Sequence, residues 1–206
     1  MPFYATYIGH INNGVFTTWD ECKAEIHKKP KYKKFATREE AEQFHLRGPF
    51  AAGENETFDV TVYTDGACKK NGKMGAKAGF GVFFGEGDPR NISQRLSGKV
   101  SNNIAEISAI LAAFERLKPD LEAGKKCGIY TDSTYCLLCC GNYGEKCEKK
   151  GWPEDVPNLE LVKAAFHLAK KYPNVSMVHV TAHTLKTDVH SNGNRQADSL
   201  ATSAIS

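Results

Sequence analysis

The sequence predicts an α/β protein in which helices flank a mixed five-stranded sheet, preceded by a small α+β module. From residue 58 onward, strand-like and helix-like segments follow one another in the order βββαβαβα. A segment rich in Gly, Pro and acidic residues at 48–56 has no sustained period and separates them from a ββαα-type pattern. We therefore expect a small domain at 1–47, a short linker at 48–57 and a larger domain at 58–206.

The first domain begins with an alternating segment, and Asn12-Asn13-Gly14 predicts a hairpin turn into the strand VFTTW. A helix is predicted at 18–27. A second helix is predicted from Thr37, which stands as N-cap with Glu40 at the capping-box position, to about Phe44. Five of the seven residues from 28 to 34 are lysines, which form a local basic patch.

In the larger domain, strands at 58–65, 78–84 and 92–96 are joined by Gly-containing turns and predict an antiparallel meander. A helix is predicted at 102–117, where Ile104, Ile107, Leu111 and Phe114 recur at helical spacing. The remaining predicted elements are a strand at 127–131, a helix from 133, a helix at 158–171, a strand at 175–180 and a helix at 194–205.

Composition restricts the class of protein. Apolar residues make up 41% of the chain and charged residues 25%, and no apolar run approaches the ~20 residues that a membrane helix needs. The N-terminus lacks the features of a signal or transit peptide. Seven cysteines, an odd number, do not fit a secreted disulfide framework, so we expect the protein to reside in the cytoplasm, or in the nucleus of a eukaryote.

The net charge of the chain is +3, which is too small for its whole surface to wrap nucleic acid non-specifically.

The cysteines near the middle of the chain offer one competing interpretation. Cys136, Cys139, Cys140 and Cys147 could bind zinc, but no second CxxC and no His pair at finger spacing accompanies them. Buried, unreactive thiols are the better interpretation.

Four carboxylates lie in contexts that suit a metal-dependent nuclease. Asp65 and Asp132 each end a β-rich run with Tyr-Thr-Asp, and they become neighbours if their strands pair. Glu106 lies about 200° around its helix from Ile104, on the face of Asn102 and Asn103. We place Asp198 near the first turn of the last helix, where the helix dipole favours a carboxylate.

Taken singly, these acids could be a surface charge, a helix-start stabiliser and two strand terminators. Taken together, four like charges close in space would be destabilising without cations. Mg²⁺, with Mn²⁺ as a substitute, is the cation that oxygen ligands of this kind bind.

With these motifs, the chain resembles type 1 ribonuclease H carrying an N-terminal hybrid-binding domain. The resemblance covers residues 58–206 and implies a ribonuclease H-like fold that cuts the RNA strand of RNA/DNA hybrids, leaving 5′-phosphate and 3′-hydroxyl ends. It assigns Asp65, Glu106, Asp132 and Asp198 to a site for two metal ions about 4 Å apart. It implies that Asp65 bridges both ions, that Asp198 helps hold the ion that activates water, and that Glu106 and Asp132 hold the ion at the leaving oxygen.

The resemblance also implies a histidine on a loop before the last acid, which matches His183 in VTAHT. Its expected role is proton transfer and product departure, because imidazole titrates near neutrality. The loop that follows is longer than in many relatives and contains a second candidate, His190.

The resemblance further implies two sets of nucleic-acid contacts in the larger domain. Residues that contact the RNA strand would be Cys68, Lys70, Asn71, Asn102 and Asn103. A pocket for a DNA phosphate would be formed by Lys99, Ser101 and Asn158. Turn formation and helix capping are simpler alternatives for these residues.

The first domain resembles the hybrid-binding module in its FYA start, its GVFTTW strand and its YKKFAT segment. The resemblance implies that Trp19 and Tyr32 pack on DNA sugars while Lys33 and Lys34 contact phosphates, and it also allows binding of dsRNA. The linker is far shorter than in many relatives, so we expect a small reach between domains and weak processivity.

Three functions are compatible with the sequence. The leading one is the hybrid endonuclease. The second is a catalytically idle hybrid- or dsRNA-binding adaptor, against which the complete set of acids and the histidine speak. The third is another ribonuclease H-like enzyme, such as a 3′ exonuclease or an integrase, although these carry different acid spacings. We expect a monomer.

Overall fold

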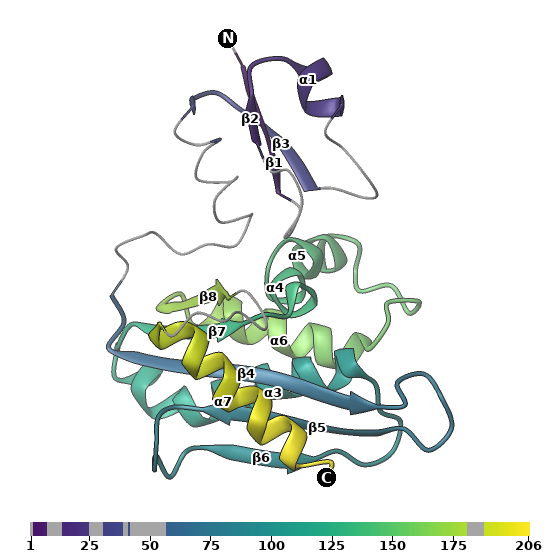
Figure 1. The fold of residues 1–206 in the computed structure, drawn as a ribbon, viewed down its shortest axis with the longest axis vertical. Helices are drawn as coiled ribbons and strands as arrows, with labels where there is room; N and C mark the ends of the chain where they lie inside the picture. Colours follow the sequence, from purple (N-terminus) through teal and green to yellow (C-terminus); the bar gives the residue numbers. More distant parts are fainter. Residues whose placement is uncertain (1, 8–13, 25–30, 39–40, 42–56, 181–187) are drawn as a thin grey trace. The chain divides into compact units, whose positions relative to one another are not determined.

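Figure 1 shows the computed structural model of the chain, which describes residues 2–7, 14–24, 31–38, 41, 57–180 and 188–206. The chain divides into two compact units, Met1–Ala51 and Ala52–Ser206. The first unit contains a three-stranded sheet and the second a five-stranded sheet.

The first unit contains one strand more than the sequence predicts. Strands β1 (Phe3–Tyr7), β2 (Gly14–Phe16) and β3 (Lys31–Phe35) form an antiparallel sheet in the order β2-β1-β3. Helix α1 (Trp19–Ala24) precedes β3, so the order is ββαβ and not ββαα up to this point. The prediction missed β3 because four of its five residues are polar or carry a polar end, while its hydrogen-bond partner β1 is distant in sequence.

The predicted helices of this unit lie partly outside the described residues. Helix α1 begins as expected, with Thr18 and Glu21 exchanging side-chain-to-backbone hydrogen bonds of 3.2 and 3.3 Å in a capping box. At the second predicted helix, Ala41 donates to the carbonyl of Thr37 at 3.4 Å. Most of the remaining residues up to Phe44 are outside the described part of the chain.

The large sheet confirms the predicted mixed five-stranded fold. Its strands are β4 (Val60–Lys69), β5 (Lys77–Phe83), β6 (Ile92–Arg95), β7 (Cys127–Thr131) and β8 (Val175–His179), in the order β6-β5-β4-β7-β8. Strands β4, β5 and β6 are antiparallel, whereas β7 and β8 run parallel to β4. The first strand of the domain therefore pairs with the fourth, which is the condition under which the sequence makes Asp65 and Asp132 neighbours.

Helices cover both faces of this sheet. The helices are α3 (Asn102–Glu122), α4 (Thr134–Cys140), α5 (Asn142–Lys149), α6 (Leu159–Lys171) and α7 (Val189–Ser203). Val62 packs in a core with Ile107 and Phe114 of α3, whereas the next residue, Tyr63, packs with Ala197 of α7. Because successive side chains of a strand point to opposite faces, α3 and α7 cover opposite faces of β4 (Figure 1). Among the described helices, none has the length and apolar character to span a bilayer.

Three helix boundaries differ from those predicted. Helix α3 continues through Pro119 to Glu122 because Leu121 is buried at 4% exposure. The helix predicted from Ser133 is two helices, separated at Gly141. Helix α7 begins at Val189, not at 194, because the side chain of Asp188 accepts hydrogen bonds from the first turn. The sequence did not predict this start, because the polar residues in the first part of α7 lack the apolar period by which a helix is predicted.

Candidate active site

Two of the four predicted acids are brought together by parallel strand pairing. Asp65 lies within β4 and Asp132 directly follows β7, and the register places Thr64 opposite Thr131. Because the strands are parallel, the two carboxylates emerge at the same edge of the sheet. Ligand oxygens of Asp65, Glu106 and Asp132 all lie within 4.8 Å of one another.

The third acid, Glu106, enters this group because α3 lies unusually close to β4. A Cβ built at Gly66 would overlap the backbone nitrogen of Glu106 and would lie 2.7 Å from the carbonyl carbon of Ala105. Only glycine allows this approach. Ser101 fixes the start of the helix by accepting a 3.2 Å hydrogen bond from the backbone of Ile104.

The fourth acid, Asp198, comes from α7 on the other face of the sheet. It is the tenth residue of that helix and not part of the first turn, so the helix dipole does not explain its position. Close packing does, because a Cβ at Gly193 would overlap the ring of Tyr63. All four acids line one cavity of about 240 Å³, together with Gly66, Ala67, Asn102, Asn194 and Arg195.

Burial and the repulsion of neighbouring carboxylates both disfavour the ionised forms of Asp65 and Glu106. Asp65 and Glu106 are each only 7% exposed. Burial, followed by the charges of Asp132 and Asp198, raises the pKa of Asp65 to about 8. Burial, followed by the charges of Asp65 and Asp132, raises the pKa of Glu106 well above its usual value. The arrangement therefore favours a compensating positive charge.

The acids fit a hard divalent cation. Asn102 donates to one carboxylate oxygen of Glu106 at 3.4 Å, but the other oxygen, Oε2, is buried without a hydrogen-bond partner. A buried carboxylate oxygen of this kind is normally paired, and a cation would supply the missing partner. Among the described residues, Asp65, Glu106 and Asp132 form the one group of three or more His, Cys, Asp or Glu side chains positioned to hold a metal ion, and Asp198 lines the same cavity without belonging to that group. The zinc interpretation of the cysteines therefore has no support.

Comparison with known proteins identifies the family. A family model for RNase H matches residues 57–206, and a model for the ribonuclease H1 N-terminal domain matches residues 2–45. The chain belongs to the ribonuclease H family. It is 30% identical to ribonuclease H of Schizosaccharomyces pombe over 97% of this chain and 95% of that one. It is 29% identical to human ribonuclease H1 over 97% of this chain and 87% of the relative.

Solved structures show the same fold. The RNase H domain of PFV superposes with a TM-score of 0.57 at 23% identity, covering 74% of this chain and 98% of that domain. The compost-derived ribonuclease H1 named LC11 superposes with a TM-score of 0.53 at 23% identity, covering 72% and 96%. The larger unit of this ribonuclease H therefore has the ribonuclease H fold.

Sequence reasoning missed the two further polar residues that line the cavity, Asn194 and Arg195. The side-chain amide of Asn194 donates to Asp132 at 3.1 Å, and its carbonyl oxygen is buried without a partner. Asn194 lies four residues before Asp198, so helical spacing alone places both on one face of α7 and could have identified it. Arg195, the single basic residue among those lining the cavity, gave no such signal because it stands in a polar stretch without a period.

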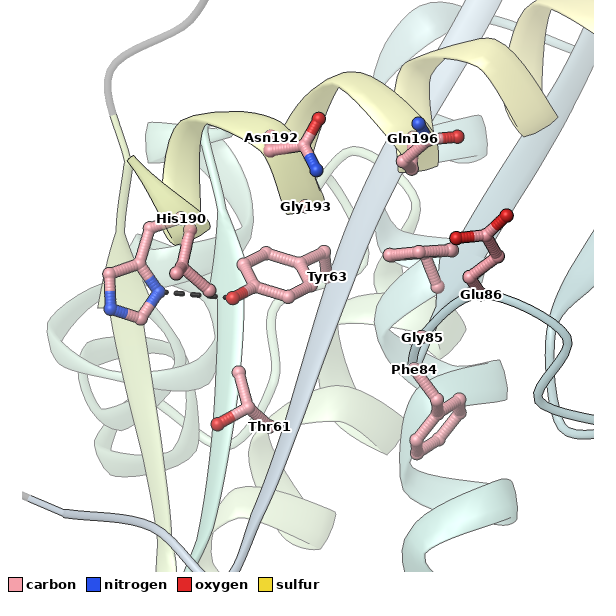
Figure 2. Close-up of a pocket in the computed structure, with 11 residues that line it drawn as sticks. Thr61, Tyr63, Phe84, Gly85, Glu86, His190, Asn192, Gly193 and Gln196 are labelled. Atoms are coloured by element: carbon pink, nitrogen blue, oxygen red, sulfur yellow. Dashed lines mark hydrogen bonds between the residues drawn. The ribbon is translucent and has the colours of Figure 1, made fainter. Parts of the chain in front are cut away.

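The two candidate histidines differ in what the structure describes. His183 lies outside the described residues. His190 lines a different pocket of about 500 Å³, shown in Figure 2, where its Nδ1 lies 3.1 Å from the hydroxyl of Tyr63. Its ring stacks on Tyr130 with centroids 4.3 Å apart. His190 is not among the residues that line the acid cavity of this ribonuclease H, so His183 remains the predicted proton-transfer residue.

The predicted RNA-strand residues belong to the end of β4, the turn after it and the start of α3. Asn71 accepts a 3.1 Å hydrogen bond from the backbone of Asn102, which links the turn after β4 to the helix that carries Glu106. Lys70 is exposed and has a left-handed φ of 55° in that turn. Cys68 is partly exposed and Asn103 is exposed.

The predicted DNA-phosphate residues have structural roles as well. Ser101 caps α3, and Asn158 precedes α6 with a left-handed φ of 56° while its amide donates to Tyr135 at 3.2 Å. Lys99 is exposed. Within the described part of the chain, no hydrogen bond given by the structure joins these three residues to one another, so the pocket remains a prediction.

In the small unit, the predicted aromatic pair forms a cluster on one face of the sheet. The rings of Trp19 and Tyr32 have centroids 5.0 Å apart and are 37% and 52% exposed. Lys34 belongs to the same face, because it stands opposite Tyr4, whose ring is 5.8 Å from Trp19. Lys33 stands opposite the buried Ala5 and therefore points to the other face, so the two lysines do not share one surface.

Proposed function

We propose that this ribonuclease H hydrolyses the RNA strand of RNA/DNA hybrids at the cavity bounded by Asp65, Glu106, Asp132 and Asp198. The convergence of these four carboxylates in one cavity carries the proposal. Family membership over residues 57–206 supports the class of reaction. Products with 5′-phosphate and 3′-hydroxyl ends follow from hydrolysis at the bond to the 3′ oxygen.

The four carboxylates would hold divalent cations, for which we propose Mg²⁺ with Mn²⁺ as a substitute. When bound, such ions activate water and neutralise the charge that develops on a phosphate during its hydrolysis. Asn194 fixes the orientation of Asp132 by donating to Oδ2 of its carboxylate. Asn102 does the same for Glu106 and also joins the turn at Asn71 to the metal site.

Recognition of a hybrid requires contact with 2′-hydroxyls on one strand. Cys68, Lys70, Asn71, Asn102 and Asn103 are proposed for this role. Asn102 lines the acid cavity, and Asn71 accepts a hydrogen bond from its backbone. The structure of one protein with this fold, the foamy viral protease-reverse transcriptase, was solved in complex with an RNA/DNA hybrid. The exposed cluster of Trp19, Tyr32 and Lys34 is proposed to bind the hybrid backbone, and dsRNA with the same groups.

The cysteines bear on the cellular compartment of the protein. We propose that the protein works as a monomer in a reducing compartment, the cytosol or the nucleus. All seven cysteines are free, and five of them lie buried in the larger unit, where burial keeps thiols unreactive.

The experiment is cleavage of end-labelled RNA/DNA, RNA/RNA and DNA/DNA duplexes with Mg²⁺, comparing the parent with Asp132→Asn. We expect RNA to be cut only in the hybrid, and Asp132→Asn to abolish cutting. Asp155→Asn, which removes an exposed acid outside the cavity, should cut like the parent. Tight hybrid binding without cleavage by the parent would favour the adaptor, and cutting of DNA/DNA would favour another ribonuclease H-like enzyme.

A further inference from the structure

The hairpin that joins β4 and β5 carries a concentration of unbalanced positive charge. Its residues 69–77 include four lysines, Lys69, Lys70, Lys73 and Lys77, all of them exposed. No Asp or Glu occurs anywhere from residue 66 to residue 85. Within the described part of the chain, none of the four lysines forms an ion pair.

Two of these lysines oppose each other directly. The register of the antiparallel pair places Lys69 opposite Lys77, so both side chains leave the same face of the sheet a few ångströms apart. Like charges in this position destabilise a hairpin. This pair lowers the stability of the free protein. A polyanion bound at the two lysines would relieve their repulsion, which explains why both are present.

Hydrogen bonds hold the turn of this hairpin in a defined conformation. Backbone hydrogen bonds of 2.9 and 3.2 Å, from Lys73 to Lys70 and from Ala76 to Lys73, close the turn. Gly72 and Gly75 supply the left-handed conformations that it requires. The hydrogen bond between Asn71 and Asn102 fixes the turn to α3, which carries Glu106.

The distance of Lys69 and Lys77 from Asp65 indicates which part of a nucleic acid these lysines would contact. Asp65, Ala67 and Lys69 alternate along β4, so Lys69 and Lys77 lie on the same face as the catalytic Asp65. Four residues of strand at about 3.3 Å each place Lys69 roughly 13 Å beyond Asp65. A nucleic-acid strand rises about 3.4 Å per nucleotide, so this distance corresponds to about four nucleotides.

We propose that Lys69, Lys73 and Lys77 form a second phosphate-binding surface, which holds the backbone of the bound duplex about four nucleotides from the cleaved bond. This inference rests on the proposed function, because it takes the acid cavity as the position of the cut. It extends the substrate contacts beyond those predicted for Lys70 and Asn71. The bound group is a phosphodiester of the hybrid, which the lysines contact as point charges without reading sequence.

The test is the salt dependence of kcat/KM for hybrid cleavage by the full chain. Each phosphate contact contributes about 0.9 to the slope of log affinity against log salt. We expect Lys73→Gln with Lys77→Gln to make the slope less steep by about two. Lys73→Arg with Lys77→Arg should keep the slope of the parent, because the charge is retained.

A matched control removes two lysines from another part of the domain. Lys118 is 60% exposed near the end of α3, and Lys126 is exposed directly before β7, at the strand end opposite Asp132. Lys118→Gln with Lys126→Gln changes the net charge equally and should leave the slope unchanged. Equal slopes for the hairpin variant and this control would overturn the proposal.

The parent, the hairpin variant and the control variant together distinguish failure of the phosphate-binding surface from failure of the proposed function. If the parent cuts no hybrid, the proposed function fails, and the salt slope of the hybrid Kd for the two variants still decides the surface. If the parent cuts and the hairpin variant has the parent slope, only the surface fails. Thermal unfolding of each variant establishes that it is folded, and removal of the opposed Lys69–Lys77 charges should raise Tm.

Discussion

Single residues in the acid cavity are held in an unfavourable state by the fold. Asp65 and Glu106 are nearly inaccessible, and burial and neighbouring charges raise both pKa values. Metal-free protein therefore contains a local repulsion that a bound cation relieves. Stability should accordingly depend on pH and on divalent metal in a way that identifies the site.

The pH dependence has a defined sign. Asp65 ionises near pH 4 in the unfolded chain and at about 8 in the folded one, so between these values the folded protein binds more protons. The free energy of unfolding should fall as pH rises through this range. In EDTA at pH 8, Asp65→Asn should be more stable than the parent by on the order of 1–2 kcal/mol.

Thermal unfolding at pH 4 and pH 8 measures this difference, which should shrink toward pH 4. Added Mg²⁺ at pH 8 should raise the Tm of the parent and have little effect on Asp65→Asn. A variant less stable than the parent at pH 8 in EDTA would contradict the expectation.

Asn194 provides a second test at this scale. Asn194→Ala removes the donor to Asp132 without removing a carboxylate, so we expect activity or metal affinity to fall about 10- to 100-fold. Asn192→Ala is the matched control, because that exposed side chain lines the separate pocket in Figure 2. Steady-state cleavage at several Mg²⁺ concentrations measures both, and equal loss in the two variants would exclude a specific role for Asn194.

Among the elements, the contact between α3 and β4 decides whether the cavity exists. Strand β4 supplies Asp65 and helix α3 supplies Glu106, and Gly66 allows the two backbones to meet. On the opposite face of β4, a glycine again permits close packing. Gly193 allows α7 to lie against Tyr63 and so positions Asp198. Packing of two helices against one strand thus places side chains that are distant in sequence.

Gly66→Ala tests this packing. The added methyl group would overlap α3, so we expect a loss of about 1–3 kcal/mol in unfolding free energy and reduced cleavage at temperatures where the variant is folded. Gly85→Ala is a suitable control, because a Cβ there meets nothing within 4 Å. Chemical denaturation of both variants gives the comparison, and similar stabilities would mean that α3 can move away at no cost.

For the molecule as a whole, we expect the small unit to contribute to binding of the substrate and the larger unit to catalyse its cleavage. The small unit has an exposed aromatic and basic face, and the larger unit has the acids. The linker predicted at 48–57, about ten residues long, would span at most roughly 35 Å when extended. The alignment with human ribonuclease H1 extends over 259 positions although this chain has 206 residues, so the relative has additional residues within the aligned region.

We expect Trp19→Ala with Lys34→Ala to weaken hybrid binding by about 1–3 kcal/mol, because both side chains belong to one exposed face. Lys33→Ala should have less effect, since Lys33 points to the opposite face. Hybrid Kd values measured by fluorescence anisotropy test this. Equal losses in the two variants would show that the basic patch acts as a whole and not through one face.

The short linker predicts weak processivity. Cleavage of long hybrids under single-hit conditions should become still more distributive when residues 1–47 are deleted. A deletion variant with the same processivity as the full chain would show that the small domain does not retain the substrate.

The sequence by itself determined the class of fold and the order of the strands in the larger domain, and it predicted the four acids that the structure brings to one cavity. Periodicity shows which side of a helix is apolar, and the two Tyr-Thr-Asp motifs point to carboxylates without any knowledge of distance, although Asp65 lies within its strand and not at its end. Tertiary structure alone decided the rest. The strand β3 depends on its partner β1, the start of α7 depends on one capping side chain, and Asn194 acquires its role only through contact with Asp132. The physical reason is that pairing, capping and burial depend on residues distant in sequence, whereas periodicity is a property of the local chain.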